Sequence, residues 1–135
     1  MTAPVITLLV TIFVITDLVV IGAVFHLAGQ SWRELSLPFP AQPVEPDGVR
    51  KNFQSFKLGM INLGMCVHVA VDARHLHLYP ALFMRVTMRA APCSIPWSAI
   101  ALKPGQKPTR RMLAAKVGKQ ELLGPRWCME LARPG

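Results

Sequence analysis

Histidine and cysteine side chains, the usual ligands of zinc, occur close together in the middle of the chain. His68 and His77 would share the outer face of an expected hairpin, near Cys66 and Tyr79. Structural zinc sites use four ligands at characteristic spacings, and those spacings are absent here. Surface histidines that pack across neighbouring strands are the simpler interpretation. We therefore expect no metal site.

Side chains for nucleophilic catalysis are scarce. Ser94 and Ser98 have no histidine–acid partner nearby in the sequence pattern, and a cysteine with a histidine does not make a catalytic triad. The sequence contains no glycine-rich phosphate-binding motif. Its three cysteines, Cys66, Cys93 and Cys128, are irregularly spaced, which favours free thiols in a reducing compartment. We expect that the protein is not an enzyme.

Positive charge is the strongest feature outside the apolar N-terminal segment. The net charge is +8, from 15 Lys and Arg residues against 7 Asp and Glu residues. Suitable partners are anionic lipid headgroups, worth about 1 kcal/mol per basic residue near a membrane, or an acidic protein surface. A solvated basic loop is the simpler alternative, and nucleic acid is not expected because no recognition motif is present. The expected basic docking surface consists of Lys103, Lys107, Arg110, Arg111, Lys116 and Lys119.

A long apolar segment near the N-terminus predicts a transmembrane helix over residues 4–28. Its only formal charge is Asp17. About 24 residues at 1.5 Å each give roughly 36 Å, enough to cross a hydrocarbon core of about 30 Å. Pro4 suits the first turn, and Gly29 is the expected C-terminal stop. A cleaved signal peptide is disfavoured, because the apolar run is too long and no Lys or Arg precedes it.

The distribution of positive charge predicts the orientation of this helix. All Lys and Arg residues follow the apolar segment, beginning with Arg33. By the positive-inside rule, the N-terminus faces outward and the rest of the chain is cytoplasmic. Trp32 lies just beyond the expected span and is predicted to be an anchor at the membrane interface.

Asp17 lies near the middle of the predicted span. A charge there costs roughly 2.5 to 3.5 kcal/mol on insertion scales, so the residue should take up a proton or face a polar group. One interpretation is lateral packing against another helix of a membrane complex, through Asp17 and the small residue Gly22. The alternative is a tolerated acid that pairs with Thr11 or Thr16 of the same helix.

His26 follows Gly22 at a spacing that puts both residues on one face of a helix. A small residue four positions before a histidine lets a flat macrocycle approach the helix backbone while the imidazole ligates the metal of the macrocycle. The pair resembles the pigment-binding pattern of bacterial light-harvesting polypeptides, whose small residue is usually alanine. The resemblance implies bacteriochlorophyll or another macrocycle near His26. A histidine that reaches the membrane interface is the simpler interpretation, and no cofactor is expected.

The rest of the chain predicts a proline-rich tether over residues 29–52 and a small β-rich cytoplasmic domain over residues 53–135. A turn at Ala73-Arg74 would place apolar residues of the two flanking strands on the same core face. For residues 82–89 an interfacial segment is the alternative to a strand, and residues 127–132 are expected to form a short helix or strand. The predicted strands are 66–71, 76–78, 82–89, 94–102 with a break at Pro96, 112–117 and 120–123.

Three short segments carry a further resemblance: GMINLGMCVHV at 59–69, LHL at 76–78 and IPWSAI at 95–100. They resemble a group of small bacterial proteins with one N-terminal span followed by a domain similar to PH or GRAM modules. The resemblance covers about residues 31 to 133; His75 stands where a turn glycine is usual, and the Met- and Arg-rich residues 83–89 depart from the pattern. It implies a PH- or GRAM-like barrel or a curled antiparallel sheet and, with the orientation predicted above, a location in a bacterial inner membrane. It implies no function.

These features predict a non-catalytic accessory subunit of a larger integral membrane complex, with respiratory and photosynthetic assemblies as natural candidates. The helix would pack against other integral membrane subunits, and the basic domain would brace the cytoplasmic face of the assembly. The alternative is a membrane-tethered PH-like module that binds anionic lipid or an acidic peptide.

Overall fold

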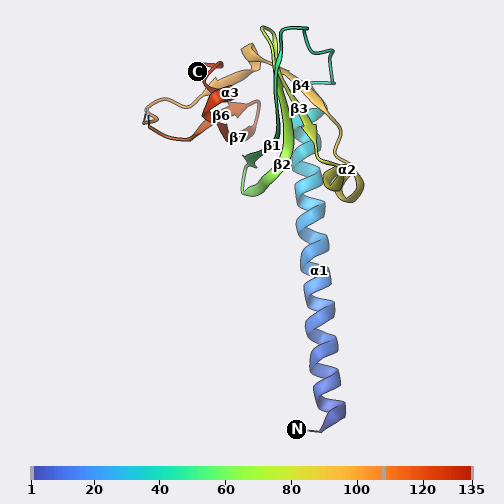
Figure 1. Cartoon of the computed structure of the whole chain (residues 1–135). Coiled ribbons are helices and arrows are strands. Elements are labelled where there is room, and N and C mark those ends of the chain that lie inside the picture. The colour runs from blue at the N-terminus through green and yellow to red at the C-terminus, as the bar shows by residue number, and fades with distance from the viewer. Residues whose placement is uncertain (1, 108, 135) are drawn as a thin grey trace.

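The structure consists of one long N-terminal helix and a small β domain built on the end of that helix (Figure 1). It is a computed structural model that describes residues 2–107 and 109–134. Helix α1 (Ala3–Ser36) is long and apolar enough to cross a membrane. The domain that follows is a nearly barrel-shaped antiparallel sheet. The predicted fold class is therefore confirmed.

One sheet in the order β4-β3-β2-β1-β7-β6-β5-β8 forms the domain, and its neighbouring strands are antiparallel except for β5 and β8. Two short helices, α2 (Leu82–Met88) and α3 (Arg126–Met129), and a 3-10 turn (Trp97–Ala99) interrupt the strands. The strands are β1 (Val49–Leu58), β2 (Ile61–Val71), β3 (His75–Pro80), β4 (Cys93–Pro96), β5 (Ile100–Leu102), β6 (Met112–Val117), β7 (Gln120–Pro125) and β8 (Arg133–Pro134).

Irregularities in β1 curl the sheet. The register of β1 against β2 shifts on either side of Gln54, and Phe53 adopts a left-handed backbone conformation with φ 53°. Such bulges bend a strand and increase its twist. The bent strand pairs with β2 along most of its length and with β7 at Lys57 and Leu58. In this way β1 joins the two halves of the sheet.

The predicted hairpins are confirmed. In β2 and β3, Val69 pairs with Leu78 and Val71 pairs with Leu76, and all of these side chains are buried. The turn at Ala73-Arg74 sets this register, as the apolar alternation predicts. The β6–β7 hairpin turns at Gly118, whose φ of 61° favours glycine.

The end of α1 differs from the prediction. Gly29 does not terminate the helix, which continues to Ser36, because the last turns bury Ala28, Trp32 and Leu35 in the core of the domain. Gly29 instead permits a close approach: a Cβ there would stand 3.1 Å from the carbonyl oxygen of Met88. Trp32 is 1% exposed, and its indole donates a hydrogen bond of 2.7 Å to the carbonyl of Ala91. Its predicted role as an interface anchor is wrong, because the ring is enclosed by protein.

Two further segments differ from the prediction. Residues 82–88 form α2 rather than the predicted strand. Met84 and Met88, four residues apart, are both buried, which is the spacing of one face of a helix. A short apolar run is compatible with both the helical and the strand periodicity, so the sequence pattern does not distinguish them. The proline-rich segment begins only after Ser36, and it lies against the domain instead of forming an unattached tether. Its backbone pairs with β4 at Pro40, and the N–H of Gln42 donates to the hydroxyl of Ser94.

Candidate functional site

A basic pocket of about 700 Å³ opens where the loop after β5 faces strands β1, β6 and β7. Lys57 comes from β1, and Lys103, Lys107 and Arg110 come from the loop. Among the described residues that line the pocket, Glu121 is the only acid, and its carboxylate lies 2.6 Å from the Nζ of Lys103. The hydrogen bond from Lys103 lowers the pKa of Glu121 below its usual value.

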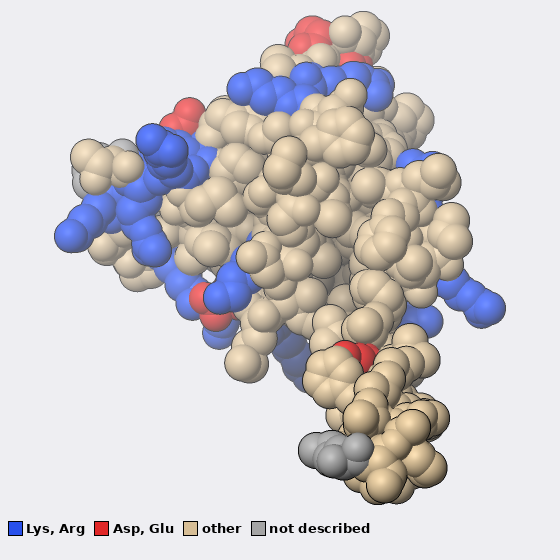
Figure 2. All heavy atoms as spheres, turned by 60° about the horizontal axis from the view of Figure 1, so that its bottom comes forward, with Lys and Arg blue, Asp and Glu red and all other residues tan. Residues whose placement is uncertain are grey.

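Three of the pocket's cations remain available to a ligand. Within the described part of the chain, Lys57, Lys107 and Arg110 form no salt bridge. Such a group of cations suits a phosphate or a pair of carboxylates. Figure 2 shows a cluster of Lys and Arg side chains on the left, the side on which Figure 1 places the loop after β5, and further Lys and Arg side chains across the top and on the right.

Two residues that the sequence analysis did not single out hold the pocket loop in shape. The amide of Gln106 donates to the carbonyls of Lys103 and Ala114 and accepts from the N–H of Ala114. The guanidinium of Arg126 donates to the carbonyls of Lys107 and Arg110. The backbone that carries the cations is therefore bound to the domain at several points.

The predicted basic surface is divided in the structure. Lys103, Lys107 and Arg110 line the pocket, whereas Arg111, Lys116 and Lys119 do not. Lys116 is exposed on β6, and Lys119 lies in the β6–β7 turn. Lys57 joins the pocket through the pairing of β1 with β7, which no local sequence signal indicates.

A second concavity, of about 440 Å³, lies between α1 and α2. Gly22, His26 and Arg33 line it from α1, and Met88 and Arg89 from the end of α2. Gly22 and His26 thus lie on one face, as their spacing predicts. We call this feature the α1–α2 groove.

Asp17 lies outside this groove on an exposed stretch of α1. The hydroxyls of Thr11 and Thr16 donate to the carbonyls of Thr7 and Ile12 in their own helix. Pairing of Asp17 with either threonine, the alternative considered above, is therefore not formed. Among residues 2–107 and 109–134, nothing hydrogen-bonds to the Asp17 carboxylate.

A buried chain of hydrogen bonds links Ser94, His77 and Asp72. The hydroxyl of Ser94 lies 2.7 Å from Nδ1 of His77, and Nε2 of His77 donates to Asp72 over 2.7 Å. The expectation that Ser94 has no histidine–acid partner is wrong, because the pairing of β3 with β4 sets His77 opposite Ser94. The expectation that His77 lies on an outer face is also wrong, since the ring is 0% exposed.

Ser94, His77 and Asp72 are the residue types of a serine-hydrolase triad, but they lack the exposure to substrate that such a triad needs. Ser94 is 3% exposed, and it bonds Nδ1 of His77, whereas the nucleophile of serine hydrolases bonds Nε2. The serine hydroxyl also accepts from the N–H of Gln42. No described concavity is lined by Ser94. The arrangement ties the proline-rich segment to the sheet.

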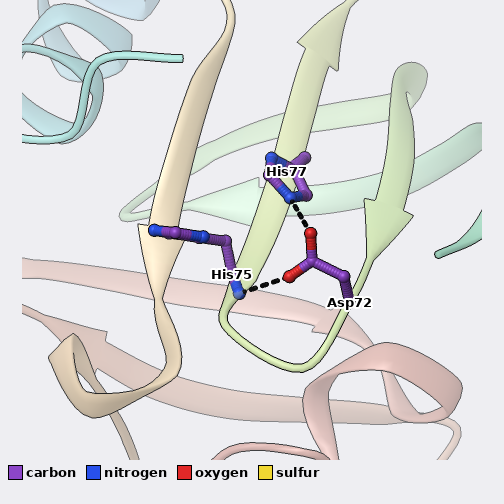
Figure 3. Close-up of side chains that lie close together, drawn as sticks. All are labelled: Asp72, His75 and His77. Atoms are coloured by element: carbon purple, nitrogen blue, oxygen red, sulfur yellow. Dashed lines mark hydrogen bonds and ion pairs between the residues drawn. The ribbon is translucent and has the colours of Figure 1, made fainter. Parts of the chain in front are cut away.

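Asp72, His75 and His77 form a group with the residue types of a metal site (Figure 3). Figure 3 shows the ring of His77 facing the carboxylate of Asp72, which His75 reaches through its backbone N–H. A cation would have to break the His77–Asp72 hydrogen bond, and three ligands fall short of a structural zinc site. His68 is bound elsewhere, where its Nδ1 accepts from the N–H of Phe53.

The cysteines are free thiols, as their spacing predicts. Cys93 and Cys128 are buried, and burial raises the pKa of each thiol to about 12. A thiol in that state is a poor nucleophile and acts as a small apolar side chain.

Comparisons with protein-family models, with curated proteins and with solved structures each give no match to this chain. The geometry of the two concavities and the exposed acid on α1 is therefore the basis for assigning a function.

Proposed function

We propose that this protein is a non-catalytic accessory subunit of a larger complex in the bacterial inner membrane, with α1 as its single span. Asp17 is the observation that carries the proposal. It is an exposed acid in the most apolar part of α1, a stretch of which 0% is buried by the rest of the protein. Exposure of that acid to lipid would cost roughly 2.5 to 3.5 kcal/mol, and a polar group on a neighbouring helix would remove this cost.

The joint between helix and domain supports a bracing role. Ala28, Trp32 and Leu35 belong to both α1 and the domain core, so the span and the domain form one body. A subunit built in this way transmits the position of its helix directly to the β domain. The same burial supports retention of α1 over its removal as a signal peptide, because cleavage before Gly29 would cut into the contact that holds the domain.

The basic pocket would supply the second contact with the complex. Figure 1 shows the loop between β5 and β6 at the side of the domain, away from the edge where α1 emerges. This position suits an acidic segment of a neighbouring subunit on the cytoplasmic side. The same cations support the second candidate function, a tethered PH-like module that binds an acidic peptide or anionic lipid. Respiratory and photosynthetic assemblies remain the candidate complexes.

Replacement of Asp17 by leucine is expected to release the protein from its complex. A polar contact between membrane helices is worth about 1 to 2 kcal/mol, so its loss weakens association roughly 5- to 30-fold. The measurement is native electrophoresis after mild detergent extraction, with mass spectrometry of the integral membrane proteins in the large band. Thr16→Val is the matched control, since this hydroxyl donates to the carbonyl of Ile12 in its own helix. An unchanged large band for Asp17→Leu would remove the lateral contact from the proposal.

Charge reversal in the basic pocket is expected to make the complex more sensitive to salt. Both side chains of the double variant Lys107→Glu/Arg110→Glu are exposed, so the fold should be retained while the contact becomes repulsive. The subunit should then dissociate at a lower salt concentration in the same native gel. Arg111→Glu/Lys119→Glu changes the charge equally outside the pocket and should behave as the wild type. Equal sensitivity of the two double variants would show that net charge, not the pocket, makes the contact.

A further inference from the structure

Helix α2 exposes an apolar face beside α1. Leu82, Phe83 and Val86 are 74%, 54% and 72% exposed, whereas Met84 and Met88 on the opposite face are buried. Figure 1 shows α2 next to α1 at the edge of the domain from which the long helix emerges. Three large apolar side chains on one face of so short a helix indicate a non-aqueous environment.

The height of α2 on α1 matches the boundary of a bilayer. A hydrocarbon core of about 30 Å takes up about 20 helical residues, which from Pro4 leads to about residue 23. The headgroup layer adds roughly 5 to 7 Å, or about four residues. Phe25 falls within this layer, and its ring packs edge-on against Phe83 of α2 at 5.7 Å. The exposed face of α2 therefore lies at the level where acyl chains meet headgroups.

The α1–α2 groove beside this face is positively charged. Arg33 and Arg89 line it, both are exposed, and none of the described lining residues is acidic. Neither arginine forms a salt bridge within the part of the chain that the structure describes. Side chains on a helix point toward its N-terminus, which directs Arg33 toward the headgroup layer. Guanidinium groups bind phosphate through paired hydrogen bonds.

Two glycines shape the groove. At Gly29 the carbonyl of Met88 would lie 3.1 Å from a Cβ, so α2 is held close to α1 there. At Gly22 a Cβ would meet nothing within 4 Å, so the groove is open toward the span. The end of the groove with Arg33 and Arg89 is cationic, and the end at Gly22 opens toward the apolar span. An amphiphilic ligand requires this combination.

We propose that the α1–α2 groove binds an anionic phospholipid, with its phosphate between Arg33 and Arg89 and its acyl chains against the exposed face of α2. The ligand is part of the bilayer that surrounds the helix, and the site needs no partner subunit. Lipid bound there would fix the height and tilt of the β domain over the membrane.

Native mass spectrometry of the full-length protein in detergent tests this proposal. Phosphatidylglycerol is titrated against phosphatidylcholine with the same acyl chains, and soluble glycerol phosphate is the third probe. The double variant Arg33→Gln/Arg89→Asn removes both cations; asparagine tolerates the left-handed backbone of Arg89, whose φ is 50°. We expect the wild type to bind phosphatidylglycerol at least about tenfold more tightly than this variant does, as loss of charge-assisted hydrogen bonds implies.

The matched control is Arg111→Gln/Lys119→Gln, which removes the same charge from exposed positions that line neither the basic pocket nor the α1–α2 groove, and it should bind as the wild type does. Equal weakening in the control, equal binding of phosphatidylcholine, or binding of glycerol phosphate as tight as that of phosphatidylglycerol would each overturn the proposal. Asp17→Leu should leave lipid binding unchanged, so failure of the lipid site and failure of the subunit contact give different results.

Discussion

Replacement of Trp32 by alanine is expected to lower the free energy of unfolding of the β domain by about 3 to 5 kcal/mol, the usual cost of deleting a buried tryptophan. The side chain is 1% exposed and belongs to the same core cluster as Phe56 and Met84. Its removal leaves a cavity where α1 enters the domain and frees the carbonyl of Ala91. The domain should therefore loosen from the helix that carries it.

Urea unfolding in detergent, followed by circular dichroism of the sheet, measures this loss. Trp32→Phe keeps most of the packing but not the indole hydrogen bond, so it should lose a smaller amount, about 1 to 2 kcal/mol. Leu27→Ala is the matched control on the same helix, because Leu27 is 55% exposed and detergent covers it in either state. If Trp32→Ala lost no more than Leu27→Ala, the end of α1 would not be part of the domain core.

Local sequence patterns predict the parts of this fold that depend on neighbouring residues. The β2–β3 hairpin follows from apolar alternation on both sides of a tight turn, and the apolar segment gives the long helix. The end of α1 cannot be predicted from local sequence in this way, because a glycine such as Gly29 is a common signal for the end of a helix. Burial of Trp32 and Leu35 outweighs that signal, and only the tertiary structure contains this information.

The candidate sites show the same division. Lys103, Lys107 and Arg110 are near one another in the sequence, and the pocket keeps them together. Lys57 and Arg126 act with them through pairing of β1 with β7 and through hydrogen bonds to the loop, which depend on contacts between distant segments. The Ser94–His77–Asp72 chain was missed for this reason too, because its order in space is set by strand register.

The carboxylate of Asp72 holds three segments together. It accepts hydrogen bonds from the ring of His77 and from the backbone N–H groups of Glu45, Arg74 and His75. Its side chain is 1% exposed. Burial by itself would raise the pKa of Asp72, but these hydrogen bonds favour the ionised form and together hold the pKa well below its usual value of 3.8.

The lowered pKa makes the stability of the domain depend on pH. A carboxyl group whose pKa is lower in the folded protein contributes stability above its unfolded pKa of about 3.9 and loses it as the pH falls toward the folded value. We expect Asp72→Asn to cost about 2 to 3 kcal/mol at pH 7, since the amide accepts fewer hydrogen bonds and brings an N–H₂ group against backbone donors. The difference from the wild type should shrink as the pH falls below about 4, because the unfolded wild-type chain then binds a proton at Asp72 while the folded protein keeps this carboxylate ionised.

Urea unfolding of the wild type and Asp72→Asn at several pH values between 7 and 3 measures both effects. Asp47→Asn is the matched control: Asp47 is exposed in the proline-rich segment, and its replacement should change the free energy of unfolding by less than about 0.5 kcal/mol. Stability curves of Asp72→Asn and the wild type that stay parallel down to pH 3 would mean that ionised Asp72 is not what ties the proline-rich segment and the β2–β3 turn to His77. Curves that approach each other towards pH 3 would instead assign the buried Ser94–His77–Asp72 hydrogen bonds to stability, because contacts that lower the pKa of a carboxylate in the folded protein contribute less once the unfolded chain can bind a proton.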